Sequence, residues 1–288
     1  MHILITDSGV GGLSVCAYAE RFVRAHGFGE PVRLTFANAA PANDYGYNSM
    51  PSTQVKLETF DRFLRTVTER YAPDLIYVAC NTLSVLLPDT PYVREAVIPI
   101  KGIVETGAQL LLQRLEADPR ATAMIFGTPT TIDSGAYPRW LEARGVELSR
   151  IICQACPTLA DAISEDREGA RIRSEIARWV DAAVESLKQT DTPVVACLAC
   201  THYGYRKDVF AEALVDAGVD AAIIDPNERA VDDLFGTRSR TSHEVTVEVV
   251  TPYVLPDATI EALTWFLSDI SPATVHAVQH FVHVPDLV

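Results

Sequence analysis

Strand-like and helix-like patterns alternate along the chain, and this alternation constrains the fold more than any other feature. Residues 75–79 form a continuous apolar run, which is typical of a strand buried on both faces of a parallel sheet. The other predicted elements are strands over residues 1–6, 32–37, 121–126, 148–153, 194–198 and 221–224, and helices over residues 13–26 and 53–71. Strands that alternate with helices in this way predict an α/β protein with parallel sheets.

The layout of the first half recurs in the second half. Asp7 ends one predicted strand and Cys80 follows another 73 residues later, and the same spacing separates Gly127 from Cys200. This spacing predicts two similar α/β domains with parallel sheets, related by a pseudo-twofold. Because open α/β sheets bind ligands at the carboxyl ends of their strands, the active site is expected in the cleft between the two domains. Cys80 and Cys200 would then lie on opposite sides of one small molecule.

Composition narrows the possible partners. The 288 residues carry a formal net charge of −14, which repels nucleic-acid phosphates and anionic lipid. No apolar run approaches the ~20 residues of a membrane-spanning helix. The first residues lack the basic region and the long apolar region of a signal peptide. We therefore expect a cytoplasmic protein with a small-molecule ligand and with neither a nucleic-acid nor a membrane partner.

The six cysteines are too few and too unevenly spaced for a disulfide scaffold, so they are expected to be thiols. Four of them form two C-x-x-C pairs, Cys153 with Cys156 and Cys197 with Cys200. Here 40 residues separate the pairs, against about 15–20 in zinc-binding patterns. Packing is the preferred interpretation for Cys153, Cys197 and Cys16, and metal binding is the alternative.

Two further motifs have weaker interpretations. His276, His280 and His283 would share one helix face, but they lack the acidic partner of a metalloprotease helix, and a packed helix is preferred. The glycines after Asp7 lack the order of a dinucleotide-binding loop. They do bring backbone N–H groups to a helix N-terminus, where a carboxylate is favoured. No metal ion is expected.

Cys80 and Cys200 differ from the other cysteines in their surroundings. Each lies at a strand-to-loop boundary, and each precedes residues with hydroxyl, amide or imidazole groups. A thiol with a pKa of about 8.5 becomes a useful base when neighbouring donors or a histidine shift that value. His202 lies two residues after Cys200, and Asp7 ends the strand that is expected beside the Cys80 strand. These features favour two reactive thiols, with two inert packing thiols as the alternative.

Four short motifs occur in order between about residues 1 and 267. They are Asp7-Ser8-Gly9-Val10-Gly11-Gly12-Leu13, Cys80-Asn81-Thr82, Gly127-Thr128 with Thr131, and Cys200-Thr201-His202-Tyr203. Together they resemble the glutamate racemases, within the aspartate/glutamate racemase superfamily. The resemblance implies a cofactor-independent, two-base enzyme that interconverts L- and D-glutamate, supplies D-glutamate for peptidoglycan and forms a homodimer.

The resemblance also implies a role for each site residue. Cys80 and Cys200 are the two bases, Asp7 supports Cys80, and His202 supports Cys200. The substrate-binding residues are Ser8, Tyr45, Gly46, Asn81, Thr82, Thr131 and Thr201. Inversion removes a proton from one face of a carbon and delivers another to the opposite face, so one thiol must be charged while the other is neutral. No lysine stands out as a Schiff-base site for pyridoxal phosphate, so a polar cleft must stabilise the carbanion.

One stretch departs from the family pattern and leaves the substrate open. Ala42, Asp44 and Asn48 stand where the family has an arginine, a proline and a lysine, whereas the Tyr-Gly pair and the following serine are kept. The alternatives to glutamate racemase are an aspartate racemase, a hydantoin racemase or a maleate isomerase of the same superfamily. A non-catalytic ligand-binding relative is a further alternative, although both cysteines, Asp7 and His202 are present.

The domain organisation is predicted from the repeat and from the extent of the four motifs. One domain comprises residues 1–100 with residues 206–267, and the other comprises residues 101–205. Residues 268–288 form a C-terminal extension. An exposed apolar helix of that length would promote aggregation, so we expect the extension to pack on the protein surface or at a subunit contact.

Overall fold

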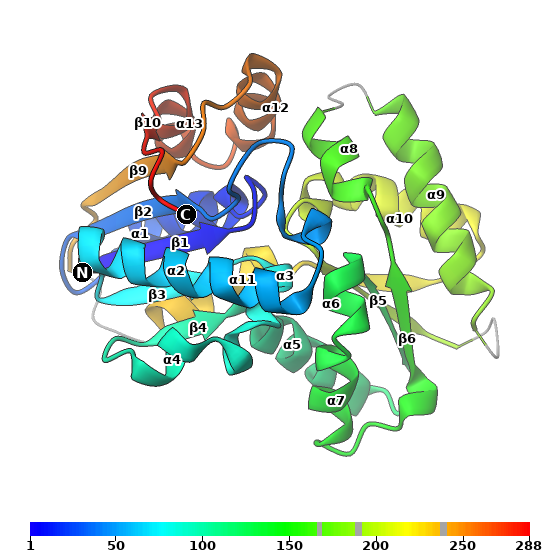
Figure 1. Cartoon of the computed structure of the whole chain (residues 1–288). Coiled ribbons are helices and arrows are strands. Elements are labelled where there is room, and N and C mark those ends of the chain that lie inside the picture. The colour runs from blue at the N-terminus through cyan, green and yellow to red at the C-terminus, as the bar shows by residue number, and fades with distance from the viewer. Residues whose placement is uncertain (166–168, 188–191, 237–240) are drawn as a thin grey trace. The chain divides into compact units, whose positions relative to one another are not determined.

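The computed structural model describes residues 1–165, 169–187, 192–236 and 241–288, and it divides into two compact units (Figure 1). Unit 1 comprises Met1–Ile103 and Asn227–Val288, and unit 2 comprises Val104–Pro226. The strands of both sheets pair in parallel, which confirms the predicted α/β class. In the described part of the chain, no helix combines the length and the apolar character needed to span a membrane.

Unit 1 is built on a six-stranded sheet with the order β10-β9-β2-β1-β3-β4. Its strands are β1 (His2–Asp7), β2 (Val32–Asn38), β3 (Leu75–Val78), β4 (Ile100–Gly102), β9 (Val245–Thr251) and β10 (Val282–His283). Its helices are α1 (Leu13–His26), α2 (Thr53–Tyr71), α3 (Asn81–Ser84), α4 (Pro91–Glu95), α11 (Pro226–Phe235), α12 (Asp257–Leu267) and α13 (Pro272–Gln279). Helix α2 buries Phe60, Phe63 and Val67, which recur at helical spacing on one face. They belong to one apolar cluster with Ile76 and Val78 of β3.

Unit 2 is built on a four-stranded sheet with the order β6-β5-β7-β8. Its strands are β5 (Thr122–Gly127), β6 (Ile151–Ala155), β7 (Val194–Ala199) and β8 (Ala221–Ile224). Its helices are α5 (Ile103–Ala117), α6 (Pro129–Asp133), α7 (Ala136–Glu142), α8 (Leu159–Glu165), α9 (Ala170–Val184) and α10 (Lys207–Asp216). Leu111 and Leu115 of α5 share a buried cluster with Ile125 of β5, so the core lies between this helix and the sheet.

Four strands of the sheet in unit 1 have the same order as the four strands of unit 2. They are β2-β1-β3-β4 in unit 1 and β6-β5-β7-β8 in unit 2. Asp7 ends β1 and Cys80 closely follows its neighbour β3, whereas Gly127 ends β5 and Cys200 directly follows its neighbour β7. The spacing of 73 residues therefore links equivalent positions, at the carboxyl ends of two adjacent parallel strands in each unit.

One segment lies in a different unit from the one predicted. Residues 206–226 were expected with the first domain, but they belong to unit 2. The reason is strand pairing: Ala221 of β8 is the partner of Val194 of β7, and α10 packs on α9. A strand-and-helix pattern alone does not state which sheet its strand joins.

The C-terminal residues, predicted as an extension, are part of unit 1 (orange to red in Figure 1). Helix α13 packs on α1 and β9, and β10 adds a strand to the edge of the sheet beside β9. Leu287 is fully buried in the same apolar cluster as α2 and β3. The packing predicted for this segment is therefore found within its own unit.

The predicted alignment of His276, His280 and His283 on one helix is wrong. Helix α13 ends at Gln279, and the rings of His276 and His280 lie 4.2 Å apart. His283 lies on β10, where its Nε2 is 3.1 Å from the carbonyl oxygen of Pro252. The chain leaves the helix because its next residues pair with β9.

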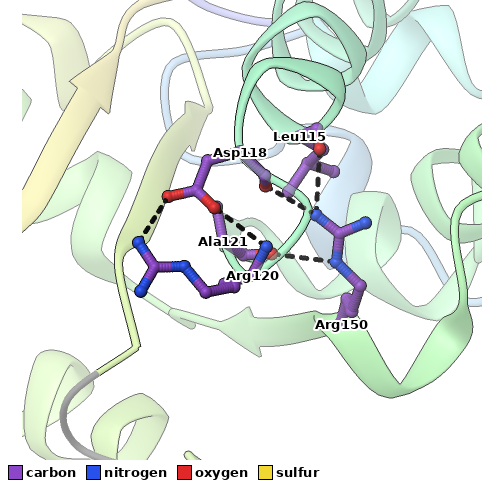
Figure 2. Close-up of polar contacts among 5 residues, drawn as sticks. All are labelled: Leu115, Asp118, Arg120, Ala121 and Arg150. Carbon is purple, nitrogen blue, oxygen red and sulfur yellow. Dashed lines mark hydrogen bonds and ion pairs between the residues drawn. The ribbon is translucent and has the colours of Figure 1, made fainter.

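Arg150 fastens the start of the sheet in unit 2 (Figure 2). Residues 148–150, predicted to begin a strand, instead form a 3-10 turn, and β6 starts one residue later. The Arg150 guanidinium donates hydrogen bonds to the carbonyl oxygens of Leu115, Asp118 and Ala121 at 3.0–3.1 Å. Arg150 therefore ties the end of α5 and the entry to β5 to the entry of β6.

We expect Arg150→Ala to lower the free energy of unfolding by about 2 kcal/mol, because three carbonyl oxygens lose a charged donor. Arg120→Ala is the matched control, since this arginine is 79% exposed and pairs with Asp118 at the surface. Its expected cost is below ~1 kcal/mol. Urea unfolding of both variants measures the difference, and equal losses would contradict the role assigned to Arg150.

Candidate active site

The glycine-rich turn after β1 holds the carboxylate of Asp7. The Gly12 N–H donates a hydrogen bond to Asp7 Oδ2, and Asp7 is almost completely buried. A Cβ atom on Gly12 would lie 2.8 Å from the Asp7 Cβ and 3.1 Å from the Ala79 Cβ. Glycine is thus required here for close approach. The sequence predicted that these backbone N–H groups favour a carboxylate, and the Gly12 N–H binds the side chain of Asp7.

Gly12→Ala is expected to lower the free energy of unfolding by about 1–3 kcal/mol, because the added methyl group overpacks the contact with Asp7 and Ala79. Gly46→Ala is the control, since its Cβ would meet only the Ser8 carbonyl oxygen, at an ordinary distance of 3.8 Å. Thermal or urea unfolding of the two variants provides the measurement. A Gly12→Ala protein as stable as Gly46→Ala would show that the turn opens without cost.

Cys80 lies next to Asp7 because β1 and β3 are adjacent parallel strands, as predicted. The Cys80 Sγ is 3.0 Å from the Ser8 Oγ, and the thiol is buried. Burial and, after it, the charge of Asp7 raise the pKa of Cys80 well above its usual value, while the hydrogen bond with Ser8 acts in the opposite direction. Unit 1 therefore holds Cys80 in its thiol form until a donor or a ligand changes the balance.

The other predicted site residues of unit 1 lie directly after Cys80 or on the loop after β2. Asn81 and Thr82 directly follow Cys80 and are each only 2% exposed. Gly46 is extended, and a Cβ atom built on it would lie 3.8 Å from the Ser8 carbonyl oxygen, so the loop after β2 passes close to Ser8. Tyr45 is 40% exposed on this unit.

Cys200 occupies the equivalent position in unit 2. It follows β7 and is 5% exposed. Its Sγ lies 4.0 Å from the His202 Nδ1, so the predicted partner is within reach of the thiol. Thr201, between them, is buried. A thiol beside an imidazole can exchange a proton with it.

A pair of threonines lies at the end of β5, the strand adjacent to β7. Thr128 caps α6, and its side chain accepts a hydrogen bond from the Thr131 N–H at 3.4 Å. The two hydroxyl oxygens are 3.0 Å apart, and Thr131 is almost completely buried. The carboxyl ends of β5 and β7 therefore present hydroxyl groups near the residues that follow Cys200.

The remaining cysteines are buried, except Cys153, which is half-buried. Burial raises the pKa of Cys16 to about 12 and that of Cys153 to about 11. Cys153 of β6 and Cys197 of β7 both pair with Ile125 of β5, so the two C-x-x-C pairs begin on strands that are not neighbours. Among the residues that the structure describes, no group of three or more His, Cys, Asp or Glu side chains is arranged to hold a metal ion.

Solved structures with a similar fold include two glutamate racemases. The enzyme from Bacillus anthracis matches with a TM-score of 0.73 and 21% identity, over 98% of this chain and 97% of that one. The enzyme from Francisella tularensis, solved in complex with D-glutamate, matches with a TM-score of 0.69 and 20% identity, over 93% and 94%. The fold is therefore the one that these amino-acid racemases adopt. No family model matches the chain.

A sequence relative identifies the family. The glutamate racemase of Syntrophus aciditrophicus is 30% identical over 248 residues, which cover 79% of this chain and 76% of that protein. The chain belongs to the glutamate racemase family, and it is thus an isomerase of the amino-acid racemase class. The resemblance carried by the four motifs is confirmed.

Proposed function

We propose that this protein interconverts L- and D-glutamate with two thiols, Cys80 and Cys200, and without a cofactor. One observation carries the proposal. Each unit places a buried cysteine at the equivalent strand end, with its own polar partners: Ser8 and Asp7 for Cys80, and His202 for Cys200. Two such thiols in one chain are what a two-base inversion requires.

In this proposal the two units are related by a pseudo-twofold, and the substrate lies in a cleft between them. Each sulfur atom must approach the same α-carbon to about 3–3.5 Å, so the two sulfurs are separated by about 7–8 Å in the closed, liganded protein. A liganded crystal structure with sulfurs more than about twice that far apart would contradict the shared site.

The proton transfers follow from the two faces of the α-carbon. With D-glutamate, the Cys80 thiolate removes the α-proton, and the electron pair of the C–H bond remains on the carbon as a carbanion. The Cys200 thiol then delivers its proton to the opposite face. The products are L-glutamate, a Cys80 thiol and a Cys200 thiolate, and the reverse reaction restores the starting state.

Polar groups around the thiols would hold the substrate and stabilise the carbanion. We assign this role to the hydroxyl, amide and backbone groups near the strand ends. They belong to Ser8, Tyr45, Gly46, Asn81, Thr82, Thr131 and Thr201. Preorganised donors in a site that excludes water stabilise developing negative charge strongly. Asp7 and His202 would orient and tune the two thiols.

The biological role is proposed from the family. D-glutamate made in the cytoplasm would supply peptidoglycan synthesis, and the protein would act as a homodimer. The six cysteines form no disulfide in the described part of the chain, which fits a reducing compartment. The Francisella relative binds D-glutamate in its crystal structure, which supports a small amino-acid substrate here.

A chiral assay tests the proposal. The purified protein is incubated separately with L-glutamate, D-glutamate, L-aspartate and D-aspartate, and the enantiomers are separated by chromatography. Racemisation of glutamate at a higher kcat/KM than aspartate is the expected result. Preference for aspartate would point instead to the substrate of a related racemase, since Ala42, Asp44 and Asn48 depart from the family pattern. No turnover of any of the four would favour a non-catalytic ligand-binding protein.

A further inference from the structure

Tyr47 is a buried tyrosine whose hydroxyl group lacks a hydrogen-bond partner. The residue is 1% exposed and begins the 3-10 turn Tyr47–Ser49, directly after Gly46. Among the described residues, no group accepts from or donates to the Tyr47 hydroxyl. Buried polar groups are nearly always hydrogen-bonded, so an unpartnered phenol in a native core has to be explained.

The position of Tyr47 suggests that explanation. Its ring packs edge-on against Phe60 of α2, with the centroids 6.3 Å apart. It belongs to the same buried cluster as Cys80. The preceding residue, Gly46, passes beside Ser8, and the Ser8 hydroxyl contacts the Cys80 sulfur. The loop after β2 therefore brings Tyr47 into the buried cluster to which Cys80 belongs.

Cys80 needs more donors than one serine supplies. Burial and Asp7 both favour the thiol form of Cys80. The proposed reaction of D-glutamate, however, starts from the Cys80 thiolate. Ser8 acts on this sulfur through its hydroxyl group, which contacts it, and through its backbone N–H, and both lower the pKa of Cys80. A thiolate in a dry site becomes stable when further O–H or N–H groups point toward it.

We infer that the Tyr47 hydroxyl is a further donor, besides Ser8, to the Cys80 sulfur in its thiolate form, directly or through one water molecule. Tyr47 is then a positioning residue of this thiol, and the inference rests on the proposed role of Cys80 as a base. The hydroxyl has no competing partner among the described residues, so it is available when the thiolate forms.

The charge state of Tyr47 fits a donor and not a base. Burial and, after it, the nearby Cys80 raise the pKa of Tyr47 above its ordinary value, while Arg62 of α2 acts in the opposite direction. These effects favour the neutral phenol, which carries the proton that a hydrogen-bond donor needs. Asp7 and Ser8 act on the same thiol from the end of β1, and both residues are kept in a Tyr47→Phe variant.

Titration of Cys80 in the Tyr47→Phe variant tests the inference. The intact protein is alkylated with iodoacetamide from about pH 7 to pH 11, and the modified Cys80 peptide is quantified by mass spectrometry. Loss of one hydrogen bond to a charged group is expected to move the midpoint of Cys80 upward by about one pH unit. Because the hydroxyl has no protein partner, the urea midpoint of unfolding is expected to stay the same.

Tyr77→Phe is the matched control, since Tyr77 is fully buried on β3 and donates its hydroxyl to Asp233 at 3.4 Å. Its Cys80 midpoint is expected to equal that of the unmodified chain. The inference fails if Tyr47→Phe leaves the Cys80 midpoint unchanged, if Tyr77→Phe shifts it equally, or if Tyr47→Phe unfolds the protein. The titration does not depend on turnover, so its result stands whether or not the chain racemises glutamate.

Discussion

Replacing Cys80 or Cys200 by serine is expected to abolish racemisation, because inversion needs a working acid or base on each face of the α-carbon. A serine hydroxyl keeps its proton at neutral pH and is a poor substitute for a thiolate. One general acid or base typically contributes about 10²–10⁴-fold, and the loss here should exceed that range because no second group replaces either thiol. The rate of loss of optical rotation, or chiral chromatography, provides the measurement.

The two serine variants also test which thiol acts on which face of the α-carbon. Elimination from a β-substituted analogue needs a single base, so Cys200→Ser should retain activity on the D analogue and Cys80→Ser on the L analogue. Cys153→Ser is the control, since this thiol lies in the middle of β6 and not at the end of a strand, and it should racemise normally. Racemisation by either site variant at near the original rate would refute the two-thiol mechanism. Preference of both variants for one enantiomer would refute the assignment of faces.

Truncation after Ser271 is expected to unfold unit 1 at room temperature. The deletion removes α13 and β10, and with them Val278 and Leu287, both fully buried. Burial of two such side chains, together with an edge strand and a packed helix, is worth more than ~5 kcal/mol. Proteins of this kind have a total stability of about 5–15 kcal/mol. Circular dichroism and solubility of the truncated chain measure the effect.

Two neighbouring substitutions separate packing from charge in this segment. Leu287→Ala should lower the free energy of unfolding by about 2–5 kcal/mol. Asp286→Ala breaks an ion pair with Arg70 in which the aspartate is 75% exposed, and it should cost less than ~1 kcal/mol. Turnover per folded molecule is expected to stay the same in both variants. A truncated chain that melts at the temperature of the full chain would show that the segment contributes no stability.

The central strands could be predicted from the sequence because they are buried on both faces. Residues of β3 and β7 are all buried, and such strands appear as continuous apolar runs. The pattern does not predict β4, β9 or β10. Two of these are three residues long or shorter, and β9 is partly exposed over much of its length. Short or half-exposed strands carry little apolar signal.

The sequence predicted that the Asp7 strand neighbours the Cys80 strand, and β1 does pair with β3, although β2 lies between them along the chain. The burial of Tyr47 could not be predicted from the sequence. Tyr45 and Tyr47 are two residues apart, and the 3-10 turn that starts at Tyr47 decides which of them is buried. Tyr45 is 40% exposed and Tyr47 is 1% exposed. A sequence motif indicates where a loop lies, but the local backbone geometry determines which of its side chains is buried in the core.

The glycine-rich turn after β1 has a consequence for chemical rescue. Its Gly12 N–H donates to an anion that belongs to the chain, namely Asp7. An Asp7→Ala variant would leave this donor at the N-terminus of α1, where small anions are favoured. Added formate should then bind in place of the missing carboxylate, in proportion to its concentration. The position that the Asp7 carboxylate occupies in the intact chain would thereby become a binding site for a small anion from the solvent.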